Sequence, residues 1–154
     1  MHITTQFSVF LVNKPGILAQ VARVIADSQS NIVAMTMADS MEHGVLRLVT
    51  DNIENTRQAL GALNIPVTET DILSIPLPNK AGALADVCAL LAQVHINIAY
   101  AYSTAGAPGG KTTAIFKVAD IKKAIKIVTK HIPKMNNRTS HQAAPKTRPP
   151  GRHR

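Results

Sequence analysis

One seven-residue pattern occurs twice in the sequence, and this repeat restricts the folds that the chain can adopt. Asn13-Lys14-Pro15-Gly16-Ile17-Leu18-Ala19 recurs 66 residues later as Asn79-Lys80-Ala81-Gly82-Ala83-Leu84-Ala85. Each copy follows an apolar run typical of a β-strand and opens a segment with helical periodicity. The sequence therefore predicts two related modules, each with a strand-to-helix turn at the same position.

The segments around the first copy predict the element order βαββαβ. We expect strands over residues 3–12, 31–37, 45–50 and 67–70, and helices over residues 17–28 and after a cap at Asp51. The second half repeats this order through a strand over 111–118 and a helix over 120–130, but its fourth strand is missing. This order predicts an α+β, ferredoxin-like fold, in which both helices cover one face of a four-stranded antiparallel sheet. We expect residues 2–5, which lie 66 positions before 68–71, to fill the missing edge of the second sheet.

The net charge of +8 is concentrated in the C-terminal segment. From residue 132 to residue 154 the chain has six Lys and Arg residues and no Asp or Glu. The segment also has few apolar residues and several prolines, so we expect it to be disordered. We therefore predict a first module over 1–70, a second module over 71–131 and a basic disordered tail over 132–154.

Reactive and metal-binding side chains form no recognisable cluster in the sequence. Cys88 is the only cysteine and falls on the inner face of a predicted helix, and the six histidines lack metal-ligand spacing. Asp39, Glu42 and His43 share one loop and could hold a metal, although a solvated loop is the better interpretation. We therefore predict a protein that is not an enzyme and has no cofactor. The single cysteine and the lack of a long apolar run indicate a cytoplasmic protein without a membrane partner.

The repeated turn is the candidate binding site. At the start of a helix the first backbone N–H groups lack intrahelical acceptors and the helix dipole is positive, which suits an anion. Gly16 and Gly82 would let a ligand or a neighbouring backbone approach closely. Asn13 and Asn79 can serve as turn residues or as ligand contacts, and their repetition favours ligand contact.

An apolar strand, the Asn-Lys-Pro-Gly-Ile-Leu-Ala turn, a helix, Asn31-Ile32 and a second strand together resemble the ACT domain family of regulatory modules. More narrowly, the chain is similar to free-standing tandem ACT proteins, in which two modules are fused without a catalytic domain. The resemblance implies that a small amino acid effector binds at the interface between the two modules. Carried onto this chain, the ligand-binding positions are Asn13, Gly16, Ile17, Leu18, Asn79, Gly82, Ala83 and Leu84. The effector would act on a partner, which is either an unidentified regulated enzyme or a second copy in a homodimer.

Five residues depart from the family pattern, and one of them is Ala81, which replaces the usual proline of the second turn. Leu11 and Leu77 stand where some serine-binding members have a histidine, so the resemblance does not imply serine as the ligand. Gln29 and His95 stand where members commonly have a glycine that ends the helix in the left-handed conformation. If this chain keeps that conformation, it costs about 1 kcal/mol at each residue.

An RNA-binding protein with a ferredoxin-like fold is the alternative function. Tyr100 and Tyr102 alternate on one predicted strand, so both point to the same face, as aromatic side chains that stack on bases do. The basic tail would add weak, salt-dependent phosphate contacts. The segment over 111–116 lacks the basic-aromatic motif of an RNA-recognition module. We therefore interpret the tyrosines as packing between the modules or as the wall of a ligand pocket, and nucleic acid as an unlikely partner.

Overall fold

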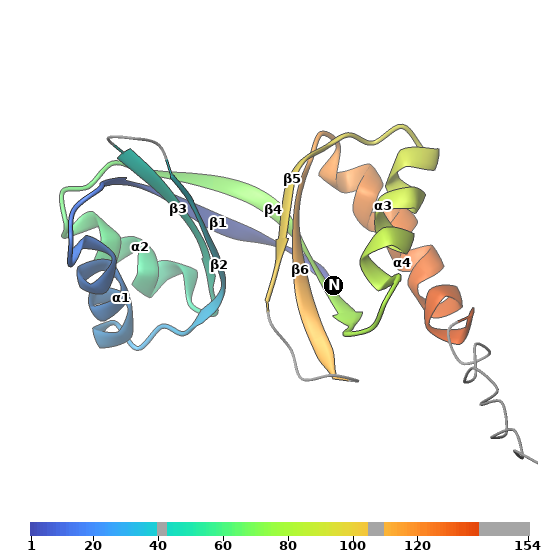
Figure 1. Cartoon of the computed structure of the whole chain (residues 1–154), viewed down its shortest axis with the longest axis horizontal. Helices are drawn as coiled ribbons and strands as arrows, with labels where there is room; N and C mark the ends of the chain where they lie inside the picture. Colours follow the sequence, from blue (N-terminus) through green and yellow to red (C-terminus); the bar gives the residue numbers. More distant parts are fainter. Residues whose placement is uncertain (40–42, 105–109, 139–154) are drawn as a thin grey trace, which may run out of the picture.

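The computed structural model describes residues 1–39, 43–104 and 110–138, and two groups of helices lie at opposite ends of a shared sheet (Figure 1). The elements are β1 (His2–Val12), α1 (Ile17–Asp27), β2 (Ile32–Asp39), β3 (His43–Thr50), α2 (Ile53–Gly61), β4 (Val67–Pro78), α3 (Ala83–Gln93), β5 (Ile98–Ser103), β6 (Lys111–Val118) and α4 (Ile121–Arg138). The predicted α+β class, with two modules of the ferredoxin-like type in tandem, is confirmed.

The strands of the described chain form one six-stranded sheet with the order β2-β3-β1-β4-β6-β5. Every neighbouring pair in this order is antiparallel. The central strands β1 and β4 serve both modules. The first module uses β2, β3, β1 and β4, and the second uses β5, β6, β4 and β1, so each half has a four-stranded antiparallel sheet.

The N-terminal part of β1 completes the sheet of the second module. His2 lies opposite Ser74, Ile3 lies opposite Leu73, and residues 4 and 5 continue the register. Leu73 also pairs with Phe116 of β6, so it has a strand neighbour on both sides. The hypothesis that residues 2–5 fill the missing edge is confirmed. The module boundary expected between residues 70 and 71 lies inside β4, because this strand is shared.

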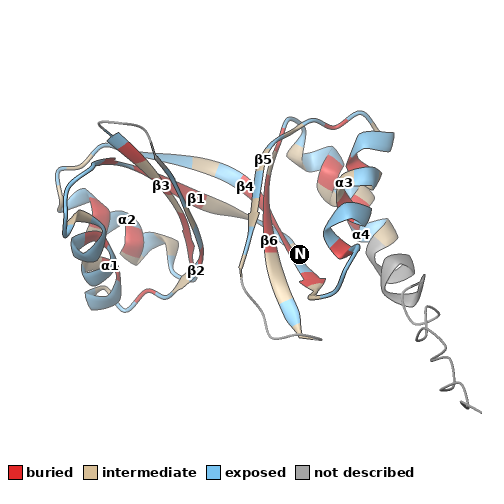
Figure 2. Cartoon of the chain, viewed as in Figure 1, coloured by how far each residue is buried: buried red, intermediate tan, exposed pale blue. Residues whose placement is uncertain are grey.

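Each helix pair covers the outer face of its own half of the sheet. Figure 2 shows buried residues on the strands and on the helix faces turned toward them. In the first module the fully buried side chains include Phe7, Leu48 and Ile25, from β1, β3 and α1. In the second they include Leu73 and Phe116, with α3 and α4 packed on top. Burial of these apolar groups is the main stabilising term of each half.

The helix-free faces of the two half-sheets turn toward each other (Figure 1), and the edge strands β2 and β5 are in contact. A smaller apolar cluster fills this space and draws residues from both modules. Its buried members are Ala34, Val49, Ile72 and Ile115, and Tyr102 packs against them. The six-stranded sheet is therefore bent so that its two halves enclose a third apolar cluster, to which both modules contribute residues.

A hydrogen-bonded glutamine joins the modules beside this cluster. The side chain of Gln6 is fully buried. Its Nε2 donates to Tyr100 OH at 2.8 Å and to Ser8 Oγ at 3.1 Å, and its Oε1 accepts from Tyr102 OH at 3.0 Å. The Arg47 guanidinium carbon lies 4.5 Å from the centroid of the Tyr100 ring. Both the nitrogen and the oxygen of the buried Gln6 amide are hydrogen-bonded, so this residue constrains the relative position of the two modules.

The cap of α2 differs from the prediction by one residue. The N-cap is Asn52, whose Oδ1 accepts from Asn55 N–H at 3.0 Å. Asp51, the predicted cap, instead accepts from Asn31 N–H at 2.8 Å and so fastens the chain before β2. The prediction was wrong because Asp51 and Asn52 are both favoured as N-cap residues. Which of them caps the helix depends on the backbone amide of Asn31, which is distant in the sequence and binds Asp51.

The predicted end of the last helix was also wrong. α4 continues to Arg138, beyond the predicted helix end at residue 130. Lys134 and Arg138 have good helix propensity, which a count of apolar residues ignores. Residues 139–154, the rest of the predicted basic disordered tail, lie outside the described residues.

Gln29 and His95 adopt the left-handed conformation expected at the helix ends. Their φ angles are 57° and 56°. After α3, His95 N–H donates to Ala92 O at 3.0 Å and Ile96 N–H donates to Leu91 O at 2.9 Å. These two bonds are those of a Schellman motif, which usually has a glycine at this position. Both residues therefore keep the conformation to which the predicted energetic cost applies.

Candidate functional site

The two copies of the repeated turn have the same backbone conformation. Gly16 precedes α1 and Gly82 precedes α3, each with a φ of 87° and without a side-chain cap. Only glycine adopts this φ easily. A Cβ at either position would meet no atom within 4 Å. Glycine is therefore needed for the backbone angle and not for the close approach of a neighbouring backbone, which was one of the two roles expected for it.

The second turn is held in place by backbone hydrogen bonds. Asn79 N–H donates to Gly110 O at 2.8 Å, which ties the turn to the start of β6, and Lys80 N–H donates to Pro78 O at 2.9 Å. Ala83 N–H makes a longer bond of 3.3 Å to Lys80 O. The amides of the first turn of α3 lack intrahelical acceptors and carry partial positive charge. This corner can therefore donate hydrogen bonds to a carboxylate.

A cleft of about 370 Å³ opens beside the second turn. Three of the predicted site residues, Asn79, Ala83 and Leu84, line it, and Gly82 lies between them at the helix N-cap. Lys80 contributes the cationic group of the lining. Among the described residues that line the cleft, none is a carboxylate, a histidine or a cysteine.

Three hydroxyl side chains that the sequence did not predict line the opposite wall. They are Ser103, at the end of β5, Thr104, which follows it, and Thr112 of β6. Thr112 Oγ1 donates to the Thr104 carbonyl oxygen, and the two hydroxyl oxygens are 3.3 Å apart. Thr113 N–H donates to Thr104 Oγ1 at 3.0 Å. Strand register brings these residues to the turn, so no local motif could have revealed them.

The first turn borders a different kind of surface. Among its predicted residues, only Leu18 lines a groove of about 160 Å³, which is apolar and lies between α1, β2 and β3. Asn13, Gly16 and Ile17 are not part of its lining. The two turns belong to helix groups at opposite ends of the molecule (Figure 1), so the structure does not bring all eight predicted residues together. All residues around the cleft beside the second turn come from the second module, so this cleft does not lie between the two modules of one chain.

The tyrosines of the RNA-binding alternative are engaged within the protein. Tyr100 and Tyr102 hydrogen-bond through their hydroxyls to Gln6, and the Arg47 side chain covers the ring of Tyr100. Burial raises the pKa of Tyr102, Tyr100 adds to this effect, and Arg47 opposes it. These rings pack between modules, one of the two roles expected for them, and do not form an open stacking surface. Residues 139–154 of the predicted tail lie outside the described residues.

The candidate metal-binding and reactive residues form no further site in the described part of the chain. No group of three His, Cys, Asp or Glu residues gathers there as metal ligands. Glu42 lies outside the described residues, so the candidate set of Asp39, Glu42 and His43 is not tested as a whole. Cys88 is partly buried and packs against the second core, as predicted. No helix in the described ranges is both long and apolar enough to cross a membrane.

Comparison with known proteins gives a consistent picture. The chain matches the family model of the ACT domain pair over residues 1–139. It resembles protein BT0572 from Bacteroides thetaiotaomicron with a TM-score of 0.77 and 29% sequence identity, over 84% of this chain and 89% of that chain. No curated protein matches the sequence.

Two regulatory subunits of aspartate kinase also have a similar structure. The ligand-free subunit from Thermus thermophilus gives a TM-score of 0.63 at 13% identity, over 84% of this chain and 97% of that one. The subunit from Thermus flavus gives 0.58 at 14% identity, over 85% and 95%. These low identities establish a shared fold alone. Because the family model covers nearly the whole sequence and the strand order agrees with two joined modules, the chain belongs to the ACT domain family as an ACT domain pair.

Proposed function

We propose that this ACT domain pair is a non-catalytic regulatory protein that binds a small amino acid in the cleft beside its second turn. The observation that carries the proposal is the lining of that cleft. It combines the amides at the start of α3, the ammonium group of Lys80 and the side chain of Asn79 with hydroxyl oxygens on the opposite wall. An amino acid needs donors for its carboxylate and acceptors for its ammonium group, and this lining supplies both.

The dimensions and chemistry of the cleft favour binding over catalysis. A volume of about 370 Å³ is within the usual range for small-ligand pockets. The described lining has hydroxyl groups and Lys80 but no carboxylate, histidine or cysteine, the side chains used most often as general acid, general base or thiol nucleophile. The fold shared with regulatory subunits of aspartate kinase supports a regulatory role, although at 13–14% identity it does not identify the ligand.

The bound amino acid would act by linkage. A ligand that binds one arrangement of the protein more tightly stabilises it and shifts every equilibrium to which that arrangement belongs. We propose that the equilibrium is association with a regulated enzyme or with a second copy of this chain. Since the cleft of one chain is formed by one module, a second copy is the route by which another module could border the ligand.

Thermal unfolding in the presence of each of the twenty standard amino acids tests this function. A ligand at 100 times its dissociation constant adds about 2.7 kcal/mol to the free energy of unfolding. Asn79→Ala should weaken the response without unfolding the chain. Asn97→Ala, which changes an exposed asparagine outside the cleft, is the matched control. If none of the amino acids raises the unfolding temperature, the proposed function is wrong.

A further inference from the structure

The repeated turns face walls of different composition. In the first module Met37 pairs with Leu46, and the equivalent pair in the second module is Ser103 with Ala114. The register also places Ala38 and Gly44 of the first module where the second has Thr104 and Thr112. Both threonines of the cleft therefore lack a hydroxyl counterpart in the first module.

Bulkier apolar side chains take up this space in the first module. A Cβ built on Gly44 would lie only 2.8 Å from Met37 Cε, so the Met37 side chain lies over the place that corresponds to Thr112. Ile17 also stands at the position of the smaller Ala83. The first turn thus keeps the backbone of a binding corner but is bordered by apolar groups.

The threonine pair of the second module offers acceptors only. Thr112 Oγ1 gives its proton to the Thr104 carbonyl, so Thr104 is the donor in the contact between the two hydroxyls. Thr104 Oγ1 in turn accepts from Thr113 N–H. A hydroxyl oxygen has one proton and two lone pairs. Each hydroxyl oxygen therefore keeps one lone pair and no proton for a ligand.

We propose that each chain binds a single amino acid, in the second module, with its ammonium group donating to the Thr104 and Thr112 hydroxyls. This inference rests on the proposed function and narrows it. The carboxylate then faces the opposite wall, where the amides of α3 and Lys80 are the donors. The cleft selects α-amino acids over 2-oxo acids of the same side chain, because a 2-oxo acid has no hydrogen to donate to the threonines.

Isothermal titration calorimetry of the full chain tests the proposal. The twenty L-amino acids are compared with 2-oxo acids of the same side chain, such as L-alanine with pyruvate. We expect one amino acid per chain and affinity at least about tenfold weaker for the matching 2-oxo acid, as for the loss of hydrogen bonds to a charged group. Met37→Ser, which changes the first module, should leave the stoichiometry at one.

Substitution of Thr112 separates a direct contact from a structural role. Thr112→Val should lower the affinity for the amino acid about tenfold and leave that for the 2-oxo acid unchanged. Thr112→Ser keeps the hydroxyl and should restore amino acid binding, which controls for folding. Two amino acids per chain, equal affinity for both ligand classes, or loss of binding in Asn13→Ala would overturn the inference and leave the proposed function intact. Failure of every amino acid to bind would overturn both.

Discussion

Thr5 lies opposite Asp71, and Asp71 is the residue that corresponds to Thr5 in the second copy of the repeat. Around this pair the register is symmetric, because Phe7 lies opposite Glu69 and their counterparts Leu73 and Ile3 lie opposite each other. An approximate two-fold axis therefore passes between Thr5 and Asp71. Through this axis each module supplies the fourth strand of the other.

Removal of residues 2–5 should destabilise the second module. Ile72, Leu73 and Ser74 would lose their backbone partners on one side and become an open strand edge. We expect faster amide hydrogen exchange at these residues and a lower unfolding temperature. Thr4→Ala, which keeps the strand backbone, is the control and should have little effect. Unchanged exchange at residues 72–74 would contradict the assigned role of the N-terminal residues.

Glycine at either left-handed helix end should stabilise the protein. Gln29 and His95 are exposed, so Gln29→Gly or His95→Gly removes few contacts and relieves the positive φ angle. We expect a gain of about 0.5–1 kcal/mol, limited by the greater freedom of glycine in the unfolded chain. Urea denaturation measures the gain. Ala89→Gly, at an exposed position inside α3, should destabilise instead, and a similar loss at residue 29 would contradict the strain argument.

The contact between Gln6 and Tyr102 should behave as a coupled pair. Tyr102→Phe leaves the buried Gln6 Oε1 without its donor, which should cost about 1–3 kcal/mol. Gln6→Leu should cost a similar amount, because it removes the partner of both tyrosine hydroxyls. In a double-mutant cycle we expect the double variant to lose less than the sum of the single losses. Strict additivity would mean that the bond does not contribute to joining the modules.

Alkaline pH should lower the free energy of unfolding through the ionisation of Tyr102. Its pKa is raised above the ordinary value of 10.0, mainly by burial. Above pH 10 the unfolded tyrosine loses its proton while the folded one keeps it. The stabilisation that Tyr102 contributes is therefore fully present below pH 10 and is lost as the pH rises toward the pKa of Tyr102 in the folded protein. Stability measured across this range should fall less steeply in Tyr102→Phe, and equal slopes would exclude Tyr102 as the cause.

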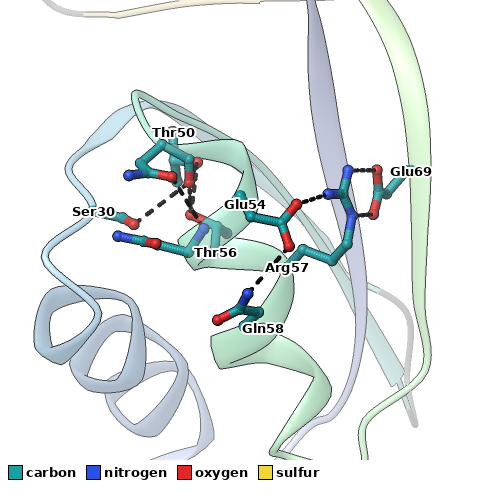
Figure 3. Close-up of polar contacts among 9 residues, drawn as sticks. Ser30, Thr50, Glu54, Thr56, Arg57, Gln58 and Glu69 are labelled. Atoms are coloured by element: carbon teal, nitrogen blue, oxygen red, sulfur yellow. Dashed lines mark hydrogen bonds and ion pairs between the residues drawn. The ribbon is translucent and has the colours of Figure 1, made fainter.

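Acid pH should remove the stabilisation that comes from the ion pair between Glu69 and Arg57, which we expect to be smaller than that from Tyr102. Figure 3 shows Arg57 of α2 between Glu54 and Glu69, and its bonds to the Glu69 carboxylate are 2.7 and 2.8 Å long. Hydrogen bonding to Arg57 lowers the pKa of Glu69 below 4.5, although burial opposes this. The stabilisation is present above pH 4.5 and is lost as the pH falls through the folded pKa.

Glu69→Gln provides the test of this ion pair. The difference in unfolding free energy between the native chain and Glu69→Gln should be small at pH 7, because the groups are exposed. It should decrease further in high salt, and it should shrink as the pH falls below 4.5. A difference that did not shrink with falling pH would have to come from packing.

Local sequence predicted the elements whose signals lie within a few residues. The bounds of β6 are those predicted, because an apolar stretch between a turn and Asp120 marks both ends. The sequence did not predict that β4 is a single strand, since Asp71 and Pro76 interrupt its apolar pattern. Pro76 is tolerated there because β1 begins with His2 opposite Ser74, so β4 beyond this point has a neighbour on one side only.

The two walls of the cleft also differ in whether a local sequence motif predicts them. The turn was predictable because Asn79 and Gly82 form a local, repeated motif. Ser103, Thr104 and Thr112 reach it only through the pairing of β5 with β6, which no short pattern encodes. The relation of Thr112 to Gly44 was also obscured, because an insertion between β5 and β6 changes the offset of the repeat at this point.

The axis through Thr5 and Asp71 has a consequence for how such a protein can evolve. Two identical subunits paired in this way would be obliged to change both corners whenever either one changed. A single gene encoding both halves removes that obligation. Methionine can then persist at position 37 while serine occupies position 103, and each corner can respond to a separate selective pressure on one shared framework.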